Sequence, residues 1–87
     1  AVGTPVVQRG GLALHRAPRG GRTWTITHVA SGRAAMLWIP SERKGRRLLR
    51  LLLGLTDWTR PMADICRSVR RRQLRPLWRQ AVGSDLI

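Results

Sequence analysis

The chain is predicted to form one small α+β domain over residues 1–87, with a three-stranded antiparallel sheet followed by two or three helices. Two observations predict this class. Apolar residues follow a period of two before Pro40, and beyond it they recur at the helical period of 3.6. The hydrophobic content of 43%, with four tryptophans, also favours a folded unit over a disordered basic tail. A domain of this length has only a thin core.

The strands are expected within residues 5–39. Leu12 and Leu14 alternate with smaller or polar neighbours, and the following Pro- and Gly-rich stretch indicates a turn. Residues 23–29 give the clearest strand, with Trp24, Ile26 and His28 on one face and three threonines on the other. A Ser-Gly turn leads into a third strand over 33–39. Whether residues 6–7 add a short edge strand is left open. His28 is expected to be a structural residue that hydrogen-bonds across the hairpin.

An amphipathic helix is predicted over residues 41–55. Ser41 is a suitable N-cap, and Glu42 suits the first turn. At about 100° per residue, four arginines fall in an arc of about 100° and six leucines occupy about 200° opposite them. This leucine arc is wider than one sheet face requires. We therefore expect it to contact the sheet and a second helix, or else a partner.

Residues 60–82 are predicted to form a basic helical segment, with Pro61 near its start. The spacing of Met62, Ile65, Cys66 and Val69 predicts one apolar face, on which Cys66 would be a small buried residue. Pro76 is expected to break or kink any helix that reaches it. The four tryptophans are expected in the core or at its rim rather than as a platform for stacking bases.

The residues do not suggest an enzyme, a metal site or a cofactor. Two histidines and three aspartates give no assignable Ser, His and Asp set, and no carboxylate pair lies at an apolar position. The single cysteine has no partner at ligand spacing, and it favours a reducing cytoplasm. No apolar run approaches the ~20 residues of a membrane span, and the N-terminal stretch does not look like a secretion signal.

Charge is the feature that bears on function. Sixteen arginines and one lysine face four acids, which gives a net charge of +13 and predicts a polyanionic partner. Codon usage in a GC-rich genome would also favour arginine over lysine, but the excess of positive charge would remain. We expect a nucleic acid, duplex DNA more than RNA, bound through arginine–phosphate contacts. The candidate binding residues are Arg16, Arg19, Arg22, Arg33, Arg43, Arg46, Arg47, Arg50, Arg70, Arg71 and Arg72.

The order of elements over roughly residues 12–55, with a tryptophan early in the middle strand and a Ser-Gly hairpin, resembles two groups of DNA-binding domains. These are the domains of plant ethylene-response factors and the arm-binding domains of tyrosine integrases. The resemblance implies that the sheet enters the major groove, with Arg16, Arg22 and Arg33 on or beside the reading face and the threonines of residues 23–27 exposed. The arginine-rich helix and the basic C-terminal extension depart from this pattern. The stretch W-T-I-T-H-V-A-S-G also looks like small phage and mobile-element proteins.

Two other interpretations fit the same residues. The protein could be a phage-encoded inhibitor that docks on an acidic host protein. Alternatively, the segment R-K-G-R-R-L-L-R-L-L-L-G-L could lie on an anionic membrane surface, although its leucines have a nearby sheet to cover. The expected location is the cytoplasm, or the virion if the protein is packaged with phage nucleic acid.

Overall fold

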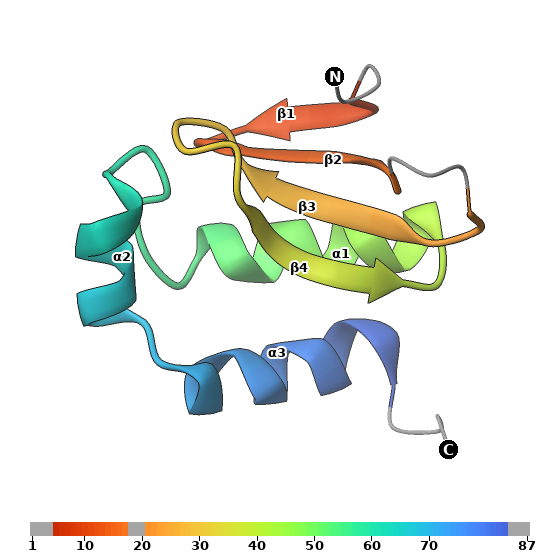
Figure 1. The fold of residues 1–87 in the computed structure, drawn as a ribbon. Helices are drawn as coiled ribbons and strands as arrows, with labels where there is room; N and C mark the ends of the chain where they lie inside the picture. The colour runs from red at the N-terminus through yellow and green to blue at the C-terminus, as the bar shows by residue number, and fades with distance from the viewer. Residues whose placement is uncertain (1–4, 18–20, 84–87) are drawn as a thin grey trace.

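Four strands are followed by three helices in a computed structural model that describes residues 5–17 and 21–83 (Figure 1). The α+β class is confirmed. In chain order the elements are β1 (Val7–Arg9), β2 (Leu12–Arg16), β3 (Trp24–His28), β4 (Ala34–Ile39), α1 (Glu42–Leu53), α2 (Met62–Ser68) and α3 (Arg71–Val82). The sheet is antiparallel with the order β1-β2-β3-β4, so it has four strands rather than the three predicted.

The additional strand is β1, and a glycine pair explains it. Arg9 pairs with Leu12, so Gly10 and Gly11 form a two-residue hairpin turn. Both have positive φ, +57° and +93°, as such a turn requires and as glycine adopts without strain. A Gly-Gly pair between two strand-like segments is a hairpin signal, and here it adds β1 to the sheet.

The two faces of the sheet differ in their cover. Leu14 pairs with Ile26, and both side chains are buried on the face that α1 covers (Figure 1). Thr25 and Thr27 lie on the opposite face, where Thr25 is directly opposite His15. The expectation that the threonine row is exposed is wrong for Thr25, which is 3% exposed. Thr25 belongs to a central strand beside the buried His15, whose Nε2 lies 2.6 Å from the Thr27 hydroxyl.

Helix α1 forms the centre of the core. The Ser41 hydroxyl accepts a hydrogen bond from the Lys44 amide at 3.2 Å, which confirms the N-cap. Leu48, Leu49 and Leu52 are buried, and the helix contacts strands β2, β3 and β4 as well as α3. The prediction that the wide leucine arc touches the sheet and a second helix is thus confirmed.

The segment between α1 and α2 is hydrogen-bonded both to α1 and to strand β3. Trp58 is buried and its indole N–H donates to the Leu52 carbonyl at 2.6 Å. His28 is fully buried, and its Nε2 donates to the Arg60 carbonyl at 2.9 Å. A carbonyl only accepts, so the other ring nitrogen, Nδ1, accepts from the Ser31 hydroxyl at 2.7 Å. His28 is therefore structural, as predicted, but its side chain bonds to the turn after β3 and to the segment before α2 rather than across the hairpin.

Helix α2 begins after Pro61 as predicted, but Cys66 does not lie in the core. Ile65 is buried, Met62 and Val69 are partly buried against the core, and Cys66 is exposed. Helix α2 ends at Ser68, and its narrow inward face holds Met62 and Ile65 but not Cys66, which faces solvent. The expectation of a buried thiol was wrong.

Helix α3 continues through Pro76, so the expected break does not occur. Proline removes one backbone hydrogen bond to the carbonyl four residues earlier, which is that of Arg72. Pro76 lies on the exposed side of α3, and the opposite side packs Leu77, Ala81 and Val82 onto the core. Packing of this apolar side against α1 compensates for the lost bond.

Leu52→Ala is expected to lower the free energy of unfolding by ~2 to 5 kcal/mol, because it leaves a cavity beneath the sheet. Leu52 is fully buried. Urea denaturation measures the change. Leu37→Ala is the matched control. Leu37 is 47% exposed, so this variant should lose much less unfolding free energy than Leu52→Ala. Equal losses at the two positions would show that α1 does not form the core.

Gly45→Val is expected to destabilise the protein by ~1 to 3 kcal/mol through overpacking. A Cβ at Gly45 would lie 2.7 Å from Cδ1 of Leu14, so the glycine allows α1 to approach β2. The control is Gly54→Ala. Gly54 has a right-handed conformation, and a Cβ there makes only ordinary contacts. Alanine at this position should stabilise by ~0.4 to 1 kcal/mol, and thermal melts would detect the opposite signs.

Candidate nucleic-acid interface

Positive charge is poorly compensated on the surface. Within residues 5–17 and 21–83, two ion pairs occur, both inside helices: Arg46 with Glu42 at 2.8 Å, and Arg67 with Asp64 at 3.9 Å. These side chains are well exposed, and surface pairs of this kind contribute little to stability. No other arginine in these ranges lies within ion-pair distance of a described carboxylate. The surface is therefore available to an external anion.

The outward face of α1 carries four exposed arginines, Arg43, Arg46, Arg47 and Arg50. They face solvent because the leucines of the same helix are held against the sheet and α3. The predicted separation of the arginine and leucine arcs is confirmed. We call this set of four the α1 arginine face.

Two grooves extend the α1 arginine face sideways. Toward β1, Arg9 joins Arg46 and Arg50 in lining a groove floored by apolar side chains. Toward α3, Arg43, Lys44 and Arg47 line a second groove with residues 80–83 at the end of that helix. The face is thus bordered by further basic side chains from β1 and from its own Lys44.

Helix α3 adds a second basic row. Arg72, Arg75 and Arg79 line a shallow hollow beside Pro76. All three are exposed, because the apolar side of α3 packs against α1. Arg70 and Arg71 are also exposed at the start of this helix. These guanidinium groups are repelled by the positive N-terminal end of the helix dipole, and a bound anion would offset this repulsion.

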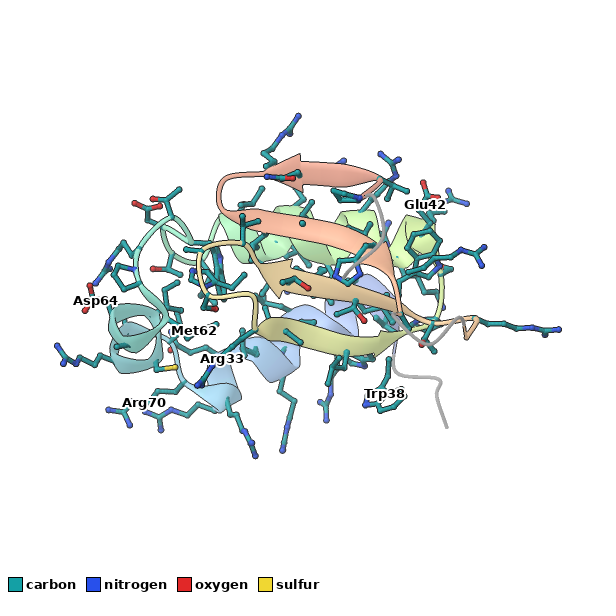
Figure 2. All side chains as sticks on the ribbon, turned by 45° about the horizontal axis from the view of Figure 1, so that its top comes forward. Arg33, Trp38, Glu42, Met62, Asp64 and Arg70 are labelled. Atoms are coloured by element: carbon teal, nitrogen blue, oxygen red, sulfur yellow. The ribbon has the colours of Figure 1, made fainter. Side chains whose placement is uncertain are left out.

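The arginines near the strands are not gathered on one face. Arg16 and Arg22 flank the connection from β2 to β3 at one end of the sheet, and the guanidinium of Arg16 lies 5.3 Å from the centroid of Trp24. Arg33 lies at the other end, beside α2 (Figure 2). Arg19 falls outside the described residues.

The sheet face opposite α1 bears no arginine among the described strand residues. By register, its side chains are those of Gln8, Ala13, His15, Thr25, Thr27 and Ala34. Figure 2 views the molecule from this side, with the helices behind the sheet. The dense basic surface of the protein therefore lies on its helical side.

Some basic residues of this surface were missing from the predicted set. Arg75 and Arg79 follow Arg72 at i+3 and i+7, which is a single helical face, but the expected break at Pro76 hid the pattern. Arg9 joins Arg46 and Arg50 only through the pairing of β1 with β2 and the packing of α1 across them. No local sequence signal could have shown this second juxtaposition.

Comparison with known protein families, curated proteins and solved structures gives no match. None of the helices in the described part of the chain is long and apolar enough to cross a membrane. The same residues contain no group of three or more side chains suited to holding a metal ion.

Asp57 shows how one acid is kept ionised in this basic protein. Hydrogen bonds from the Thr59 side chain and then its backbone hold the pKa of Asp57 below the ordinary value of 3.8, and Arg60 acts in the same direction. A lowered pKa in the folded state means that the ionised carboxylate stabilises the fold above about pH 3.8. This contribution is lost as the pH falls through the folded-state pKa.

Asp57→Asn is therefore expected to lower the free energy of unfolding near neutral pH, and the difference from the wild type should shrink toward about pH 2. Urea denaturation across this range measures it. Thr59→Val removes the hydroxyl donor. In this background, the pH-dependent part of the change in unfolding free energy caused by Asp57→Asn should be smaller. A difference that is constant with pH would contradict this account.

Proposed function

We propose that the protein is a nucleic-acid-binding protein rather than an enzyme, and that it binds duplex DNA in preference to RNA through the α1 arginine face and the arginines of α3. The observation that carries the proposal is the exposure of four arginines on one helix face, of which Arg46 alone pairs with a described carboxylate. Arginine suits this role because its planar fork grips phosphate oxygens with two parallel hydrogen bonds.

The geometry of α1 favours contacts with the phosphate backbone. Arg43 and Arg50 are about 10 Å apart along the helix axis, since the rise is ~1.5 Å per residue. Duplex DNA carries one charge per ~1.7 Å of its axis, so a row of this length lies beside several phosphates. The helix is covered by the sheet on one side and by α3 on another, which limits how deeply it can enter a groove. We therefore propose affinity with little dependence on base sequence.

The partner also suggests where the protein acts. Nucleic acid would be met in the cytoplasm of a host cell or inside a phage particle, and we propose that location together with the function. An acidic host protein would use the same arginines, and it is the alternative outcome of the test below.

The logarithm of the affinity for duplex DNA is expected to fall with the logarithm of the salt concentration with a slope near −5, if about six phosphates are neutralised. Replacing Arg43, Arg47 and Arg50 together with glutamine should weaken binding strongly and reduce the slope by about 3, since each lost contact releases about one counterion fewer. Fluorescence anisotropy with a labelled duplex measures both quantities. This set avoids Arg46, which pairs with Glu42.

The matched control is the triple change of Arg16, Arg22 and Arg33 to glutamine, which removes the same number of charges. It should reduce the slope much less. A larger effect of this control would assign binding to the sheet side, as the resemblance to sheet-reading domains implies. No binding to any nucleic acid at ~50 mM salt, where screening is weak, would contradict the proposal and favour an acidic protein partner. Urea melts of both variants verify that they are folded.

A further inference from the structure

Trp38 differs from the other tryptophans in its exposure. Trp24 and Trp58 are buried, and Trp78 is partly buried against the core. Trp38 is 73% exposed, so the expectation that all four tryptophans serve the core or its rim is wrong at this position. Its indole is a large aromatic surface that faces solvent from the edge strand β4.

The backbone at Trp38 is also unusual. Its φ is +62°, and within the described residues it is the only non-glycine residue with positive φ. This left-handed conformation is disfavoured for a bulky side chain, and such residues concentrate at functional positions. A disfavoured conformation that also exposes an indole brings no benefit to the core. The observation therefore points to a role outside folding.

A β-bulge produces this conformation. Trp24 pairs with Ile39 and Ile26 pairs with Met36, so the stretch of β4 between the paired residues is one residue longer than that of β3. Bulges re-aim side chains and occur next to functional sites. A second irregularity lies between Ile26 and Thr27. Two irregularities make β4 a poor edge for pairing with another strand, which argues against β-augmentation as the purpose of this edge.

Trp38 lies near the end of β4, five residues before Arg43 in the first turn of α1. Its side chain points away from the sheet at the lower edge of β4 (Figure 2). The end of β4, the start of α1 and the end of α3 lie at the same side of the molecule (Figure 1). This is where Arg43, Lys44 and Arg47 line the groove between α1 and α3. An aromatic surface and a basic groove at the same side of the molecule are the combination that single-stranded nucleic acid requires, because bases stack while phosphates pair with cations.

We propose that Trp38 stacks on an unpaired base of a nucleic acid whose backbone lies along the groove of Arg43, Lys44 and Arg47. This inference rests on the proposed function and extends it. Phosphate contacts on α1 hold the backbone, and Trp38 selects nucleic acid that has an unpaired base, such as the single-stranded tail of a duplex. Stacking does not depend on base identity, because every base presents an aromatic face.

The test compares a blunt duplex of about 16 base pairs with the same duplex carrying a tail of about four thymidines. The wild type should bind the tailed duplex about 10-fold more tightly. Trp38→Leu, which is apolar but cannot stack, should remove this preference and leave affinity for the blunt duplex unchanged. Trp38→Phe should keep much of the preference. Binding of the tailed duplex should also quench indole emission in the wild type, and this quenching should be smaller in Trp38→Phe.

A stability measurement separates stacking from folding. Trp38→Gly removes the side chain and suits the positive φ, so it should melt at or above the temperature of the wild type while it loses the preference for the tail. If Trp38→Leu keeps the preference, or if the wild type binds both duplexes equally, the stacking role is overturned and the proposed function stands. If the wild type binds neither duplex, both are overturned.

Discussion

The structure depends on the packing of one helix against two neighbours. The leucines of α1 meet the sheet on one side and α3 on another, and among the described residues the core is built around this helix. Gly45 allows close approach to β2, and Trp58 and His28 then secure the segment that leaves α1. In a domain this small, most of the stabilising apolar burial must come from this arrangement.

The packing of α1 also determines which surface of the protein carries its arginines. Because α1 gives about half of its circumference to leucine, its arginines are confined to the remaining face, where Arg9 of β1 and Lys44 of the same helix add further positive charge. The sheet surface that α1 does not cover bears no arginine among the described strand residues and holds the hydrogen-bonded His15 and Thr27 instead. Basic and uncharged surfaces therefore lie on opposite sides of the sheet. This separation underlies our preference for the helical side as the interface.

Edge strand β4 couples the fold to the proposed interface. Its bulges disrupt the regular ladder and discourage pairing with other strands, and they hold the exposed Trp38 near the end of β4, shortly before α1 begins. The disfavoured backbone at Trp38 is maintained by pairing on both sides of the bulge, where Ile39 and Met36 keep their partners in β3. A stable sheet thus supports a local conformation that the sequence around Trp38 would not adopt alone.

The sequence by itself determined the features that depend on near neighbours. These include the Ser41 cap, the two-faced α1, the start of α2 after Pro61 and the strand over Trp24–His28, because capping and periodicity are local properties. The total charge, and with it the expected class of partner, was equally a property of composition. Tertiary structure decided the burial of Thr25, the exposure of Cys66, the continuity of α3 and the grouping of Arg9 with Arg46 and Arg50. Each depends on which surfaces meet across distant segments, and the bulge at Trp38 depends on strand register, which no local pattern contains.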